Sequence, residues 1–250
     1  MKPYYEVGGV VVYLGDMREI LSKLEVSGGV CITDPPYGET SLGWDRWVDG
    51  WPSLLDGRFS SLWCFGSMRM FLARGGEFLD GGWRMSQDLV WEKHNGSGFH
   101  ADRFKRVHEH AVHWFRGEWG SVYKSPVMTM DAAKRTVRSK SRPPHTGHIE
   151  RTPYESKDGG PKLMRSVFHV PSCHGTAVHP TQKPLGVIWP LVEYSVPEGG
   201  VVVDPFCGAG STLVAARDAG RRAIGIEADE RYCEATARRL HERLPLEECV

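Results

Sequence analysis

The stretch that decides the fold is VVVDPFCGAGST, residues 201–212, followed directly by LVAA, residues 213–216. An apolar run of strand type ends in Asp204, Gly208 and Gly210 allow a tight turn, and the alanine-rich segment begins a helix. Ligands of open α/β sheets bind at the carboxyl ends of the strands, which is where Asp204 falls. The stretch therefore predicts a strand, a glycine turn and a helix at a ligand site.

A second acid, Glu227, ends the next predicted strand, 23 residues after Asp204. An acid at about this offset meets the ribose hydroxyls of a bound nucleoside. The G-x-G-x-x-G pattern of dinucleotide sites is incomplete, because Leu213 replaces the third glycine, and no Walker motif is present. An adenosine-containing ligand is favoured, and a plain turn between strand and helix is the alternative for this motif alone.

The rest of the chain alternates in the same way. Helix-like segments at 17–24, 212–219 and 230–243 are interspersed with strand-like runs. These runs are 10–14, 30–33, 61–65, 89–92, 111–115, 201–204 and 223–227. This alternation predicts an α/β fold with a mostly parallel sheet.

Composition indicates an ordinary globular protein, with 40% hydrophobic and 25% charged residues. No apolar run reaches the roughly 18 residues that a membrane span needs. The N-terminal run before Asp16 is interpreted as the first strand and not as a signal peptide, so we expect a cytoplasmic protein. The six cysteines form no C-x-x-C pair, which favours reduced thiols.

Charge is unevenly distributed although the formal net charge is zero. Residues 91–170 contain 15 Lys and Arg against 8 Asp and Glu, so the remainder is acidic. Within this region, residues 117–165 break the strand–helix rhythm and carry a basic run: Lys134, Arg135, Arg138, Lys140 and Arg142. We predict an insertion at 117–167 that binds nucleic acid, between two halves of one domain, 1–116 and 168–250. A solvated basic loop is the alternative.

A rigid loop follows the predicted strand at 30–33. Its residues are Asp34, Pro35, Pro36 and Tyr37. Consecutive prolines cannot donate backbone hydrogen bonds and restrict their own φ angles, so the sheet must stop there. The loop holds a carboxylate, free carbonyls and an aromatic ring at a strand end. By itself it could also be a plain turn or a short proline ligand.

The motif DPPY at 34–37, with HPTQKP at 179–184 and DPFCGAGST at 204–212, resembles the β subgroup of amino-group DNA methyltransferases. The resemblance covers about 9–116 and 168–243. It implies a Rossmann-like class I methyltransferase fold in permuted motif order: a seven-stranded mixed, mostly parallel sheet with helices on both faces, plus the basic recognition insertion. It also implies S-adenosyl-L-methionine as cofactor and double-stranded DNA as substrate. A homodimer and a cognate restriction nuclease are further partners that it allows.

The resemblance assigns roles to matching residues. Asp34, Pro35, Pro36 and Tyr37 would be catalytic, with Asp34 also next to the cofactor. Glu227 would bind the ribose, Thr181 and Lys183 the cofactor's carboxylate, and Asp16 its adenine amino group. The remaining cofactor residues would be Asp204, Phe206, Cys207, Gly208, Ala209, Gly210, Ser211 and Thr212.

The expected chemistry is transfer of the sulfonium methyl group to adenine N6 of a base rotated out of the duplex, stacked on Tyr37. Asp34 and the Pro35 carbonyl would accept the two amino hydrogens. Cytosine-N4 enzymes of the family usually begin this motif with Ser, so Asp34 favours adenine. Cytosine N4, an RNA or protein amino group, and a DNA-binding module without cofactor are alternatives. The spacing of three histidines, 108, 110 and 113, matches no metal motif, so no metal site is predicted.

Overall fold

The computed structural model describes residues 1–94, 96, 101–137, 154–173, 175 and 177–242. The chain divides into a larger unit, Met1–Ser125 with Ser166–Val250, and a smaller one, Pro126–Arg165. The smaller unit is narrower than the predicted insertion at 117–167. Residues before it stay with the larger unit because the Trp119 ring packs on Phe115, at a centroid distance of 5.0 Å, and the Ser125 N–H donates to the Tyr194 carbonyl, at 2.7 Å.

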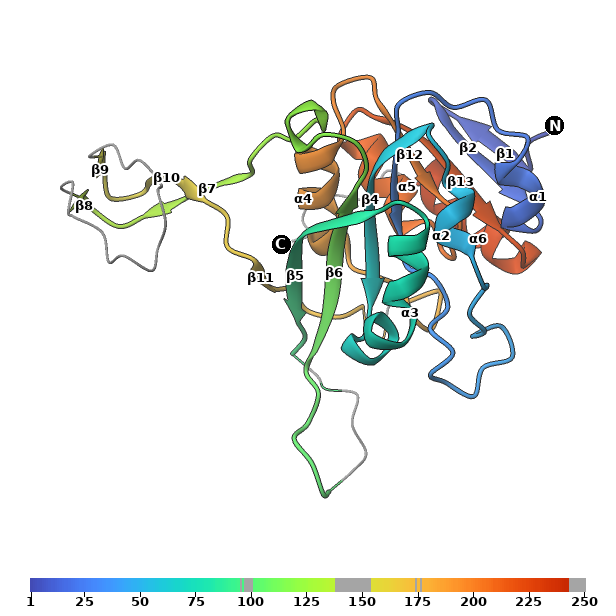
Figure 1. The fold of residues 1–250 in the computed structure, drawn as a ribbon, viewed down its shortest axis with the longest axis horizontal. Helices are drawn as coiled ribbons and strands as arrows, with labels where there is room; N and C mark the ends of the chain where they lie inside the picture. The colour runs from blue at the N-terminus through green and yellow to red at the C-terminus, as the bar shows by residue number, and fades with distance from the viewer. Residues whose placement is uncertain (95, 97–100, 138–153, 174, 176, 243–250) are drawn as a thin grey trace. The chain divides into compact units, whose positions relative to one another are not determined.

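The larger unit is built on one sheet, which has nine strands within the described residues, in the order β1-β2-β13-β12-β3-β4-β6-β5-β11 (Figure 1). All seven predicted strands are present: β2 (Val10–Leu14), β3 (Gly29–Thr33), β4 (Phe59–Gly66), β5 (Arg84–Glu92), β6 (His108–Phe115), β12 (Val201–Asp204) and β13 (Arg222–Glu227). The expected count of seven is two too low. Short edge strands add one at each side, β1 (Tyr5–Val7) and β11 (Val167–His169), and three residues are too few for a recognisable pattern.

Strand directions confirm a mixed, mostly parallel sheet. Strand β6 runs antiparallel to both of its neighbours, β4 and β5, and β1 is antiparallel to β2. The other neighbouring strands pair in parallel. Strands β3 and β12 lie side by side, and the chain continues from β3 to β4 on one side and from β12 to β13 on the other. Such a topological switch point opens a crevice at the carboxyl ends of the two strands.

Two sets of helices cover the two faces of the sheet (Figure 1). Helices α1 (Met17–Leu21), α2 (Trp51–Leu54) and α3 (Met68–Asp80) contact one another in turn. Helices α4 (Leu185–Ser195), α5 (Ser211–Asp218) and α6 (Glu230–His241) do the same. Helix α1 ends three residues before the predicted end at 24. Ser67 and Asp229 cap α3 and α6 by accepting backbone N–H groups of the first turn, as favoured N-cap residues do.

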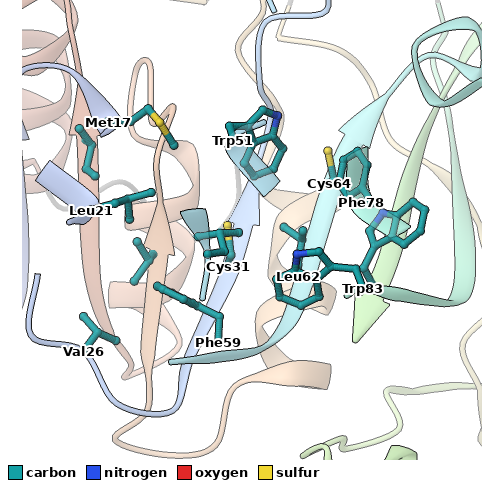
Figure 2. Close-up of a cluster of buried hydrophobic side chains, with 14 of the residues drawn as sticks. Met17, Leu21, Val26, Cys31, Trp51, Phe59, Leu62, Cys64, Phe78 and Trp83 are labelled. Carbon is teal, nitrogen blue, oxygen red and sulfur yellow. The ribbon is translucent and has the colours of Figure 1, made fainter. Parts of the chain in front are cut away.

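A cluster of buried side chains joins α1–α3 to the sheet (Figure 2). Trp51 of α2 packs edge-to-face against Phe78 of α3, with ring centroids 5.7 Å apart. Cys31 and Leu62 reach the same cluster from β3 and β4, and both are fully buried. Burial of one such large apolar side chain contributes about 1.5–3 kcal/mol, so this cluster fixes the strand ends that carry DPPY.

The smaller unit contains two antiparallel pairs, β7 (Met128–Ala132) with β10 (Gly160–Leu163), and β8 (Arg135–Val137) with β9 (Tyr154–Ser156). Lys134 and Arg135 are exposed there. The other members of the predicted basic run, Arg138, Lys140 and Arg142, lie outside the described residues.

No helix in the described part of the chain is long and apolar enough to cross a membrane. The cysteines of that part form no disulfide bonds with one another: Cys31, Cys64, Cys173, Cys207 and Cys233.

Candidate active site

A cavity of about 1230 Å³ opens at the carboxyl edge of the sheet. It is lined by the loops after β2, β3, β12 and β13 and by the HPTQKP segment, so all three motifs meet there. Pockets for one small ligand are typically about 300–1,000 Å³. The cavity therefore has room for a cofactor together with part of a second ligand.

The ends of β3 and β12 are tied together by Asp204. The Thr33 hydroxyl donates to Asp204 Oδ1 at 2.7 Å, and the Phe206 N–H donates to the same oxygen at 3.1 Å. Asp204 is 3% exposed, and burial raises its pKa to about 6 despite these donors. Asp204 thus fixes the position of the glycine turn relative to the strand that leads into DPPY.

The turn itself depends on two glycines with positive φ, +49° at Gly208 and +72° at Gly210. A Cβ on Gly210 would lie 2.5 Å from Thr236 Cγ2 of α6, so only glycine fits. A Cβ on Gly208 would face the His179 ring at 3.6 Å. The backbone at Gly208 therefore borders the cavity without a side chain between them.

Glu227 closes the same region from the end of β13. Its carboxylate accepts the Gly208 N–H at 2.9 Å and the Asp229 N–H at 2.8 Å. Burial raises its pKa, and the backbone donors oppose this shift. Each oxygen keeps acceptor capacity toward the cavity that it lines, which suits the hydroxyl groups of a ribose.

Asp34 lies at the start of the rigid loop after β3. Its Oδ1 accepts the Tyr37 hydroxyl and its Oδ2 accepts the Lys183 ammonium. Burial raises the pKa of Asp34, and Lys183 acts in the opposite direction. Both carboxylate oxygens are held, so the group has one fixed orientation at the cavity wall.

Two charged residues that the sequence analysis did not select complete this cluster. Glu109, in β6, places Oε2 3.3 Å from Lys183 Nζ and accepts the Lys93 ammonium on Oε1. Lys93 directly follows β5. Glu109 lies just before the strand predicted at 111–115 and inside the observed β6, but nothing in the sequence placed it beside Asp34.

The predicted partner of Lys183 was the cofactor's carboxylate. The structure instead directs its ammonium toward Asp34 and Glu109, with 7% of the side chain exposed. Thr181 is exposed, and its hydroxyl lies 3.1 Å from His179 Nδ1. Contact of either residue with the cofactor stays a prediction.

Asp16 lines the cavity but also caps α1. It accepts the Arg18 N–H at 2.8 Å and pairs with the Arg18 guanidinium. If Asp16 binds the adenine amino group of the cofactor, as predicted, its carboxylate has to bind Arg18 at the same time.

Most of the other predicted cofactor residues line the cavity, and Gly210 supports the turn from behind them. The lining members are Phe206, Cys207, Gly208, Ala209, Ser211 and Thr212. An aromatic wall also lines the cavity: the His179 ring lies 5.2 Å from Trp44 and 4.1 Å from Tyr232, measured between centroids, and no sequence pattern indicated Tyr232.

The sheet order and the site at its switch point define a class I methyltransferase fold. A family model for N6/N4 methyltransferases, described as DNA methylase, matches residues 29–238. The chain belongs to this DNA methylase family.

Two curated relatives are similar to parts of the chain. YubD of Escherichia coli (strain K12), which is provisionally named a methylase, is 48% identical over 66 residues, 26% of this chain and 29% of YubD. The type II methyltransferase M.HinfI of Haemophilus influenzae is 26% identical over 186 residues, 74% of this chain and 47% of M.HinfI. The matches therefore span less than half the length of either relative.

Solved structures show the same fold at low sequence identity. The complex of M1.HpyAVI with S-adenosylmethionine has a TM-score of 0.64 and 20% identity, covering 92% of this chain and 98% of that one. The cytosine-N4-specific PvuII DNA methyltransferase has a TM-score of 0.69 and 14% identity, covering 99% and 92%.

Proposed function

We propose that the chain transfers a methyl group from S-adenosylmethionine to N6 of adenine at a specific site in double-stranded DNA. The observation that carries the proposal is that Asp34 opens onto the same cavity as the glycine turn and Glu227. A methyl acceptor held at Asp34 would therefore share one enclosed space with a cofactor held by the turn.

The residues around the turn fit an adenosine-containing cofactor. Glu227 offers acceptor oxygens at the end of β13, and Gly208 leaves the backbone open to a ligand. When bound, S-adenosylmethionine supplies an electrophilic methyl group. Phe206 forms an apolar wall of the cavity, held edge-on by Trp51 at a centroid distance of 5.5 Å, and would keep water from the methionine portion of the cofactor.

The DPPY loop suits an exocyclic amino group. The Asp34 carboxylate and the Pro35 carbonyl would accept the two amino hydrogens, which would leave the nitrogen lone pair free to attack a methyl group. The Tyr37 hydroxyl donates a hydrogen bond to Asp34, which holds the ring in place, and the ring offers a face on which the flipped base would stack. The proton leaves readily once nitrogen carries the methyl group, and Asp34 is positioned to accept it.

Cytosine N4 is the second candidate substrate. It presents the same kind of amino group, and the PvuII enzyme of the same fold is cytosine-N4-specific by name. Asp34 in place of Ser at the first position of the motif supports adenine.

DNA is the proposed partner, and the basic run is its proposed contact. Replacing Lys134, Arg135, Arg138, Lys140 and Arg142 with Ala should weaken DNA binding and flatten its salt dependence, with cofactor binding retained. If the variant and the wild-type protein bind DNA with equal affinity across a salt series, the basic run is a solvated loop instead. A homodimer and a cognate restriction nuclease stay predictions.

The test is incubation with tritiated S-adenosylmethionine and mixed-sequence DNA, followed by digestion to nucleosides. Label should appear in N6-methyladenine, and Asp34→Asn should lose it while still binding cofactor in calorimetry. Label in N4-methylcytosine would overturn the choice of base. Label in RNA alone would overturn DNA as the substrate, and absence of cofactor binding would overturn the enzyme proposal altogether.

A further inference from the structure

Four alternating charges form a largely buried chain at the wall of the cavity, in the order Lys93, Glu109, Lys183 and Asp34. The side chains are between 7% and 20% exposed. They come from distant parts of the sequence: the end of β5, β6, the segment before α4 and the loop after β3. The charges sum to zero, and each ionised group in the chain has an oppositely charged neighbour.

Lys183 is the shared member of this chain. It donates to Asp34 Oδ2, and its Nζ is 3.3 Å from Glu109 Oε2. That Glu109 oxygen is buried and makes no hydrogen bond to any described residue. The Phe65 and Tyr37 rings, with centroids 5.4 and 5.9 Å from Nζ, border the ammonium. An acceptor thus lies within a small movement of an ammonium now bonded to Asp34.

We propose that Glu109 is a positioning residue that takes over the Lys183 ammonium from Asp34 when the amino group of the target base arrives. The inference rests on the proposed function, in which Asp34 must accept an amino hydrogen. An Asp34 oxygen already bonded to an ammonium is a weakened acceptor. Movement of the ammonium to Glu109 Oε2 frees Asp34 Oδ2, keeps Lys183 paired and satisfies the Glu109 oxygen, with no net charge moved out of the cavity.

Lys93 limits how strongly Glu109 attracts Lys183. It donates to Glu109 Oε1, and its ammonium lies 4.6 Å from the centroid of the Trp91 ring. Although burial acts to raise it, Lys183 and Lys93 hold the pKa of Glu109 at about 2, so Glu109 stays ionised. Removing Lys93 should therefore move the ammonium toward Glu109, and removing the charge of Glu109 should leave it on Asp34.

Other titratable groups also face this cluster. Tyr37 and Cys64 contact or face Asp34, Asp204 faces it from β12, and His179 faces Lys183. Asp204 has a pKa of about 6, so its titration overlaps the acid limb of any activity profile. Cofactor affinity measured over the same pH range separates the Asp204 effect, because Asp204 holds the glycine turn.

The experiment measures the single-turnover methylation rate against pH for Glu109→Gln and Lys93→Gln. For two carboxylates that share one ammonium, taken to be about 6 Å apart at an effective dielectric constant of about 20, the charge of one shifts the pKa of the other by roughly two units. The acid limb of this pH–rate profile is where the rate falls as Asp34 becomes protonated. We expect this limb to move to lower pH by roughly one to two pH units in Glu109→Gln and to higher pH in Lys93→Gln. The plateau rate of Glu109→Gln should also fall by about tenfold or more, with cofactor affinity unchanged.

The matched controls are Glu234→Gln and Arg238→Gln, which remove the same charges from an exposed ion pair on α6. Neither should move the acid limb, because solvent screens that pair. Shifts of the same sign in both cluster variants, or a Glu109→Gln enzyme with the wild-type rate and limb, would overturn the inference. A wild-type protein that methylates no nucleic acid would instead refute the proposed function.

Discussion

Replacement of Asp204 by Asn should stabilise the protein, because burial of an ionised carboxylate at this strand end costs folding free energy. Thr33 and Phe206 donate to one Asp204 oxygen, and an amide oxygen can accept both bonds. Burial nevertheless raises the pKa of Asp204 to about 6 from 3.8. The folded state therefore binds more protons than the unfolded state between these values, and stability falls as pH rises through about 6.

The magnitude follows from the shift of about two pKa units, which corresponds to about 3 kcal/mol. If the amide mimics the protonated acid, Asp204→Asn should be more stable than wild type by about 3 kcal/mol at pH 8 and by about 1.5 kcal/mol at pH 5. Urea unfolding at a series of pH values measures this difference, and other titrating groups cancel between the two proteins. A difference that does not change between pH 5 and pH 8, or a variant less stable than wild type at pH 8, would refute the reasoning.

His113 is fully buried between Ser61 and Ser86, and burial lowers its pKa to about 4. The wild-type protein should therefore lose about 2 kcal/mol of stability when the pH falls from 7 to 5, and His113→Gln should not show this loss. Urea unfolding that shows the same change in stability between pH 7 and pH 5 for both proteins would contradict this. Gly210→Ala should cost at least about 1 kcal/mol more than Gly199→Ala, since both glycines have positive φ but only the first Cβ meets Thr236; equal unfolding midpoints would count against it. Asp45→Ala should cost about 2 kcal/mol and expose the loop at 38–45 to proteolysis, because its carboxylate accepts the backbone N–H groups of 38, 39 and 40. An unchanged cleavage pattern would show that the loop is ordered by other contacts.

The cavity combines a rigid part and an adjustable part. Asp204, Thr33 and the glycine turn are locked by short hydrogen bonds and by backbone conformations that only glycine adopts readily. The shared Lys183 ammonium has two acceptors within reach. Such a division suits a site that must hold one ligand in a fixed place and respond to the arrival of another.

Local pattern determined much of this protein. The apolar runs that end in Thr33, Asp204 and Glu227 predicted the strands, because a buried parallel strand needs a continuous apolar sequence. The glycine turn and DPPY were recognisable because their chemistry depends on residues adjacent in the chain. The order of the motifs then indicated the family, which the family match at 29–238 confirms.

Only the tertiary structure decided which distant residues meet. The antiparallel insertion of β6 between β4 and β5 places Glu109 at the cavity, and Lys93 follows β5 there because the two strands pair in register. The fold directs the Lys183 ammonium between two acids, Asp34 and Glu109, a pairing that no spacing in the sequence indicated. The physical reason is that strand order and burial set electrostatic partners, and neither can be read from the spacing of charges along the chain.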